Sequence, residues 1–325
     1  MAHLRRRKVM PTAAQPVASS AAGAGGPPAG RRSGTDADTT VPIDVPAVVG
    51  FGFWAAASTA MVAAVSLATG ITTPPRSGPN CHGGCVAYPY TDAAAFVPRD
   101  YLWMYPTLLM AVVFVVVSVC IHYWVPAGRR LFSATGVCLT VMAAGALVVD
   151  YAVQLTVMQA GLRTGETEDL SVLSQYNPHG MFIGLENVGY ATLNLAFVFL
   201  GIALATRGSK LARATAWVFA AGGALTLLLL VVSAGIYGTG LDYRFEVMSL
   251  LVTWLVLITV GVLLSVTFAR AGLTHDAHLT REKVSHGDTA DRPGAPELRL
   301  RHRPRERLPH PTGGFRAACE LYIGD

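Results

Sequence analysis

Residues 177–206 of this 325-residue chain read NPHGMFIGLENVGYATLNLAFVFLGIALAT. Most of the stretch is apolar, and at about 1.5 Å per residue a helix of this length crosses a hydrocarbon core of about 30 Å. It also carries a carboxylate, an imidazole, a phenol and amides, which fall within roughly 60–80° of one another on a helix. Such a stripe is costly in lipid, so we expect it to face other helices or a wet cavity. The stripe consists of His179, Glu186, Tyr190 and Asn194, with Asn187 at its edge.

Apolar runs of this length occur along the whole central part of the chain. Only 14% of the residues are charged and 52% are hydrophobic, whereas a soluble domain has about a quarter charged residues. The sequence therefore predicts an all-α, polytopic bundle of six transmembrane helices, with the lipid bilayer as its partner. The predicted spans are about 48–70, 101–125, 131–159, 181–206, 211–236 and 245–269.

Two polar tails flank the predicted transmembrane domain, residues 45–270. Residues 1–44 form a basic arm, and residues 271–325 form a tail rich in Arg and His. Both contain too few large apolar side chains to fold alone, so the sequence predicts that both are disordered. The basic tail could lie against anionic lipid headgroups, although a solvated tail is the simpler interpretation.

The connections between the predicted spans differ in charge. The short connections at 126–130 and 207–213 carry Arg and Lys without acidic residues, whereas those at 71–100, 160–180 and 237–244 carry both signs. The positive-inside rule then predicts both termini in the cytoplasm and the protein in the cytoplasmic membrane. The same rule accounts for the net charge of +5, so nucleic acid is not a predicted partner.

Two acidic residues lie inside consecutive predicted spans. Counted by helical rise, Asp150 lies roughly 13 Å and Glu186 roughly 10 Å below the outer surface. Gln154 follows Asp150 by four residues and shares its helix face. One interpretation is a pocket near the outer leaflet that binds a proton, a cation or a small solute. The alternative is that these side chains hydrogen-bond one another and hold helices together, at about 0.6 kcal/mol per pair. The polar residues concerned are Asp150, Gln154, His179, Glu186, Asn187, Tyr190 and Asn194.

The entry to the fourth predicted span contains a histidine. Asn177 precedes a proline, which disfavours a helical backbone, and its side chain could cap the following helix. His179 then lies near the membrane interface, and an interfacial role is favoured over ligand binding. The other histidine beside a span, His122, lies at the opposite membrane surface, so the two cannot hold one haem. No cofactor is predicted.

Cys81 and Cys85 lie in the first outer connection, separated by a His and two Gly residues. A disulfide between them is the favoured interpretation, because thiols outside the cytoplasm can oxidise. The alternative is a metal site formed by both cysteines and His82, with His179 and Glu186 beneath it. No metal is predicted, because no paired C-x-x-C pattern is present.

Aromatic residues cluster at the start of the second predicted span. Tyr101, Trp103 and Tyr105 lie at its outer edge. Their position predicts that they form an interfacial aromatic belt.

Sequence signatures of enzymes are missing. The chain has no Walker loop, no G-x-S-x-G elbow and no H-E-x-x-H motif. We therefore expect a non-enzymatic protein that binds or transports a small solute or cation, as a transporter would. A scaffold or partner protein is the competing hypothesis, and a membrane-embedded enzyme ranks third. The sequence makes no prediction of oligomeric state.

Three short segments resemble a set of uncharacterised bacterial multi-pass integral membrane proteins. These segments are SQYNPHG at 174–180, running on to Glu186, YLWMYP at 101–106, and Asp150-Tyr151. The resemblance covers residues 48–270 and neither tail. It implies the six-helix topology and no particular activity.

Overall fold

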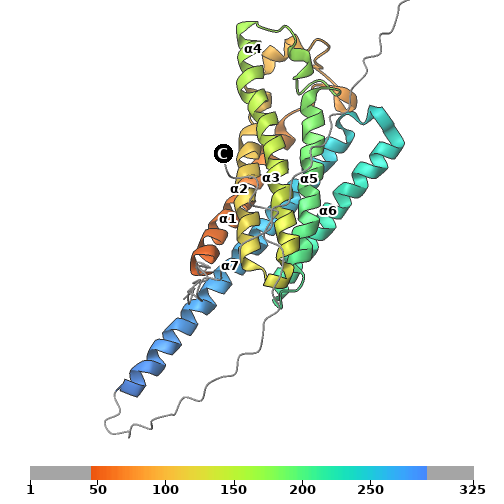
Figure 1. The fold of residues 1–325 in the computed structure, drawn as a ribbon. Helices are drawn as coiled ribbons and strands as arrows, with labels where there is room; N and C mark the ends of the chain where they lie inside the picture. Colours follow the sequence, from red (N-terminus) through yellow and green to blue (C-terminus); the bar gives the residue numbers. More distant parts are fainter. Residues whose placement is uncertain (1–44, 291–325) are drawn as a thin grey trace, which may run out of the picture. The chain divides into compact units, whose positions relative to one another are not determined.

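The computed structural model describes residues 45–290, and this part of the chain contains helices and no strands (Figure 1). Six of its helical segments are long and apolar enough to cross a membrane. The predicted all-α fold with six such helices is confirmed, and it supports a multi-pass membrane protein. The long helices are α1 (Val45–Thr72), α2 (Met104–Trp124), α3 (Arg130–Ala152), α5 (Met181–Leu204), α6 (Lys210–Tyr237) and α7 (Asp242–Ala290).

The third apolar segment is longer than a single regular helix. A π-helical turn, Val153–Met158, follows α3 and leads into the short α4, Gln159–Thr164. A π turn inserts an extra residue into the helical repeat and is frequent at functional sites. It begins three residues after Asp150 and contains Gln154, and both of these side chains are buried.

The last helix continues beyond the predicted span. The apolar part of α7 ends at Thr274, and the helix itself ends at Ala290. The predicted C-terminal tail therefore begins with helical residues. Its remainder, 291–325, and the predicted arm, 1–44, lie outside the described residues.

The six long helices pack in a closed order (Figure 1). Helix α1 contacts α2 and α7, α3 lies between α2 and α5, and α6 lies between α5 and α7. Helix α5 also contacts α7 directly. Small residues permit close approach: a Cβ atom on Gly261 of α7 would lie 2.7 Å from the backbone oxygen of Ala56 in α1. This use of glycine is typical of helix pairs in membranes.

The connections meet at two ends of the bundle. At the end that we call the long-loop end, residues 73–103, 165–180 and 238–241 lie together. The Tyr243 hydroxyl donates to the Gln175 carbonyl at 3.0 Å and lies 2.8 Å from Ser77 Oγ. The opposite end, the short-loop end, contains residues 125–129 and 205–209.

The short-loop end is also fixed by a side-chain contact. The guanidinium of Arg207 lies 4.0 Å from the ring centroid of Trp124 and donates to the backbone oxygen of that residue. Trp124 in turn contacts Phe268 of α7, with the ring centroids 5.4 Å apart. Cationic residues of the short connections thus lie at this end.

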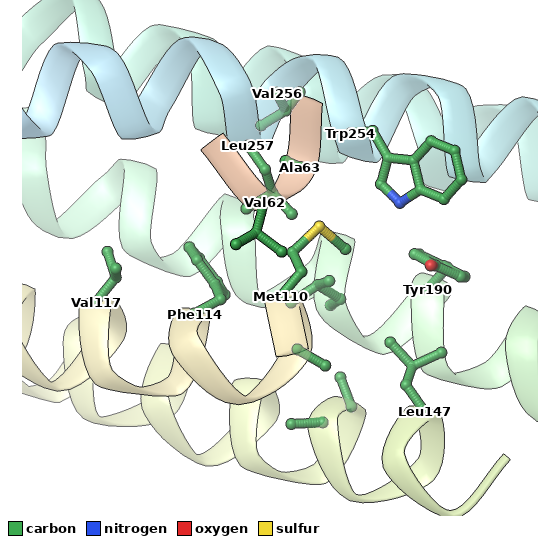
Figure 2. Close-up of a cluster of buried hydrophobic side chains, with 14 of the residues drawn as sticks. Val62, Ala63, Met110, Phe114, Val117, Leu147, Tyr190, Trp254, Val256 and Leu257 are labelled. Atoms are coloured by element: carbon green, nitrogen blue, oxygen red, sulfur yellow. The ribbon is translucent and has the colours of Figure 1, made fainter. Parts of the chain in front are cut away.

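An apolar layer fills the bundle between its two ends. Figure 2 shows Met110 and Phe114 pointing from α2 toward Val62 of α1 and Leu257 of α7. Phe114 also stacks edge-on against Phe197 of α5 at 5.4 Å between centroids. The cavity lined by Met110, Phe114 and Leu257 has a volume of only about 10 Å³. The layer therefore closes the bundle at this depth.

Candidate binding site

Three buried carboxyl groups from three helices interact with one another. Asp150 of α3, Glu186 of α5 and Glu246 of α7 are 2%, 0% and 7% exposed. The Glu186 carboxyl interacts electrostatically with both others, and Asp150 interacts with Glu246. One oxygen of each has no hydrogen-bond partner, namely Asp150 Oδ2, Glu186 Oε2 and Glu246 Oε2. We call this set the carboxyl cluster.

One tyrosine binds the second oxygen of Glu186, and another tyrosine contacts the first one. The Tyr151 hydroxyl donates to Glu186 Oε1 at 2.5 Å and lies 2.8 Å from the Tyr190 hydroxyl. All three side chains are fully buried. Figure 2 shows the Trp254 ring next to Tyr190, with its nitrogen on the Tyr190 side. This chain of contacts joins α3, α5 and α7.

Two further predicted residues hold neighbouring elements together. Asn194 donates to Thr253 Oγ1 of α7 at 2.7 Å and to the Tyr190 carbonyl at 2.9 Å. Gln154 donates to the carbonyl of Leu173 at 2.5 Å, which ties the π turn to the loop before α5. Hydrogen bonds of this kind hold helices together, as the alternative interpretation of the polar stripe predicts.

Asn187 and His179 complete the predicted stripe, and they differ in exposure. Asn187 is half-buried, and its Oδ1 has no hydrogen-bond partner. His179 is exposed in the loop before α5, where its backbone N–H donates to Asn177 Oδ1 at 3.0 Å. The capping role expected for Asn177 is wrong, because α5 begins after Gly180 and has no side-chain cap. The Asn177 side chain is therefore hydrogen-bonded within the turn that contains Pro178 and does not cap α5.

A cavity of about 350 Å³ opens beside the carboxyl cluster at the long-loop end. It lies between the last turns of α1 and the first turns of α7, with Phe182 of α5 and Trp103 at its wall. Glu246 is the member of the carboxyl cluster that lines it. None of the polar residues predicted for the pocket lines this cavity. This cavity therefore differs from the expected pocket between the third and fourth spans. Of the predicted residues, Asp150 and Glu186 interact with Glu246 in its wall.

Aromatic and aliphatic side chains form most of the cavity wall. Trp103 lies 6.1 Å from Trp254 and 6.5 Å from Phe182, measured between ring centroids. Gly70 of α1 makes room for Trp254, since a Cβ atom there would lie 2.7 Å from the indole ring. The aliphatic residues of the wall include Leu67, Ile71, Leu250 and Leu251.

A buried ion-pair network closes one side of this cavity. Asp100 is 1% exposed and accepts from Arg76 Nε at 3.0 Å and from Arg99 Nε at 2.8 Å. The Tyr176 hydroxyl also donates to it, at 3.2 Å. Burial, followed by the proximity of Tyr101 and Asp100, raises the pKa of the Tyr176 phenol well above its ordinary value. Tyr176 therefore remains a hydrogen-bond donor, and the charge of Arg76 is balanced by Asp100.

The outer connection contains a disulfide between Cys81 and Cys85, with their Cα atoms 5.9 Å apart. It lies close to the network, because the Val86 N–H donates to the carbonyl of Arg76 at 2.7 Å. The bond occupies both thiols that the alternative metal site would need. Among residues 45–290, no group of three or more His, Cys, Asp or Glu side chains is arranged to hold a metal ion.

Sequence reasoning missed Glu246 and misplaced two aromatic residues. Glu246 lies at the start of the last predicted span and was not among the predicted site residues. The belt role expected for Tyr101 and Trp103 is wrong, since they are 0% and 8% exposed. Tyr105 alone of the three is largely exposed. The loop at 73–103 folds over the bundle and buries the other two.

Comparisons with protein-family models, with curated proteins and with solved structures find no match for this chain.

Proposed function

We propose that this protein of the cytoplasmic membrane binds a small solute in the cavity at its long-loop end, and that it does so as a receptor or carrier. The observation that carries the proposal is the carboxyl group of Glu246. Glu246 is 7% exposed and lines the cavity, where no basic residue is paired with it. Buried polar groups in native proteins are nearly always paired, and the cavity gives a ligand donor access to this side chain.

The cost of leaving this group unpaired supports the same conclusion. A buried acceptor without a hydrogen bond costs about 1–3 kcal/mol, and more when it is charged. Glu186 and Asp150 add to the cost, because like charges at close range disfavour ionisation of all three groups. A bound donor or cation next to Glu246 would offset both terms.

The apolar layer below the cavity favours a receptor or carrier over a channel. Met110, Phe114 and Leu257 are buried and line a cavity of only about 10 Å³ at that depth. Transport would require a second arrangement of the helices that opens the short-loop end, as in carriers that alternate access to a central site.

Two features support a long-loop end that faces outward. The basic residues of the short connections, Arg129, Arg130 and Arg207, are at the opposite end and favour the cytoplasm. The disulfide between Cys81 and Cys85 lies at the long-loop end, and disulfides persist in oxidising compartments.

The function can be tested by thermal unfolding of the purified full chain with a panel of small metabolites and inorganic cations. We expect at least one compound to raise the melting temperature of the wild type and not that of Glu246→Gln. The matched control is Glu168→Gln, an exposed acid at the same end, which should respond like the wild type. A scaffold protein would show no compound-dependent difference between the two variants.

The orientation can be tested by thiol labelling in intact cells, in a background where Cys319 is replaced by Ser. A membrane-impermeant maleimide should label Glu168→Cys in intact cells and Gly128→Cys only after permeabilisation. Both positions are exposed. The reverse pattern would place the long-loop end in the cytoplasm.

One set of hydrogen bonds favours the scaffold hypothesis. The bonds of Asn194 to Thr253 and of Gln154 to Leu173 hold elements together without reaching the cavity. The predicted polar stripe thus supports a structural role at some positions, while the proposed binding function rests on Glu246.

A further inference from the structure

We infer that the solute is a small organic ammonium ion, with an apolar or aromatic body and a nitrogen that carries at least one N–H. This inference rests on the proposed binding function and specifies its ligand class. Three properties of the cavity lead to it, namely its charge, its aromatic wall and the carboxyl group of Glu246 in its lining.

The charge balance around the cavity favours a cation. Its wall contains one Arg and two acids, Arg76 against Asp100 and Glu246. Arg76 is bound to Asp100 at 3.0 Å, which leaves Glu246 without a positive partner in this wall. Glu186 and Asp150 lie near Glu246 and bring no positive charge to it. The carboxyl group of Glu246 therefore remains available to pair with a cation.

The lining favours an organic cation over a metal ion. Hard cations such as Na⁺ or Ca²⁺ require several oxygen ligands, and the described residues include no acidic or His/Cys cluster arranged for a metal. Trp103, Phe182 and Trp254 instead offer a continuous aromatic wall. Aromatic faces attract ammonium groups by about 0.5–2 kcal/mol when the site is desolvated.

The carboxyl group of Glu246 selects among ammonium ions. An N–H donor can hydrogen-bond this carboxyl group, which lines the cavity, whereas a quaternary ammonium has no hydrogen to donate. A cavity of about 350 Å³ falls near the lower limit of small-molecule pockets, roughly 300–1,000 Å³. A phenethyl or hexyl chain is therefore of suitable size for the apolar part of the wall.

The test measures binding to the purified full-length protein by isothermal titration calorimetry. The probes are phenethylammonium, the neutral 2-phenylethanol, the anionic phenylacetate and phenethyl-trimethylammonium. We expect phenethylammonium to bind at least tenfold more tightly than each of the other three. Glu246→Gln should weaken its binding at least tenfold, and Glu168→Gln should leave binding unchanged.

A second variant tests the same cavity in case the Glu246→Gln protein does not fold. Leu251 lines the cavity and is 41% exposed, so Leu251→Trp should fill the cavity without disturbing the core, and should block phenethylammonium. Equal binding of the alcohol or of phenylacetate would overturn the inference, as would unchanged binding in both variants. If instead another solute from the panel binds in a Glu246-dependent way and the ammonium does not, the ligand class is wrong and the binding function stands. If no solute binds, both are wrong.

Discussion

Asp100→Ala is expected to lower the free energy of unfolding by about 3–5 kcal/mol, the range observed when one partner of a buried ion pair is removed. Asp100 is 1% exposed and is bound by Arg76 and Arg99. Without it, the largely buried guanidinium of Arg76 keeps its charge and loses its partner, and Tyr176 loses an acceptor. Unfolding in mixed detergent, followed by circular dichroism, measures the change.

The matched control is Asp92→Ala, since Asp92 is an exposed acid in the same connection. It should change the free energy of unfolding by less than about 0.5 kcal/mol. A double variant, Asp100→Ala with Arg76→Met, should recover part of the loss, because removing both charges leaves no unpaired ion. Equal stability of Asp100→Ala and the wild type would show that the network does not hold this end of the bundle together.

The helices could be predicted from the sequence because their signal is local. Each long apolar run is a property of a single segment, and lipid leaves the backbone no alternative to helical hydrogen bonding. The π turn at Val153–Met158 was not predictable in this way. Its Gln154 is held by the carbonyl of Leu173, a contact made in the folded loop.

The centre of the site was only partly predictable. Glu186 and Asp150 stood out because acids within apolar runs are rare. Glu246 did not, because it lies near the start of α7, where a charge is ordinarily interfacial. A signal was nevertheless present: Glu246, Ser249, Thr253 and Leu257 are spaced by three or four residues and are all buried. Reading this stripe would have placed Glu246 on the inner face of the helix.

The position of the cavity depends on helix order, which the sequence does not encode locally. The expected pocket assumed that consecutive spans form the site. In the structure, the first and last helices, α1 and α7, are neighbours, and the cavity lies between their ends. Trp103 and Tyr101 were assigned to an aromatic belt because their burial depends on how residues 73–103 fold back over the bundle.

Glu186→Gln and Glu186→Leu together should separate the binding role from the structural role of the carboxyl cluster. Gln retains an acceptor for Tyr151 and cannot ionise beside Glu246 and Asp150. We therefore expect the free energy of unfolding of Glu186→Gln to equal that of the wild type or to exceed it, because repulsion between buried carboxyl groups is removed. Leu also removes the acceptor, which should cost about 1–3 kcal/mol through the unpaired Tyr151 hydroxyl.

Solute binding should respond differently from stability in these two variants. If the cluster supplies negative charge to a cation at Glu246, both variants should weaken solute binding at least tenfold, although only Glu186→Leu loses stability. Asn194→Ala is the matched control, because Asn194 bonds Thr253 and does not line the cavity, so its variant should lose stability and keep solute binding. Calorimetry and detergent unfolding of the same samples give both quantities. The contrary result is that the Glu186→Gln variant binds solute like the wild type but unfolds at a lower temperature. Glu186 would then be a residue that holds helices together, and Glu246 would be the sole charge that the solute contacts.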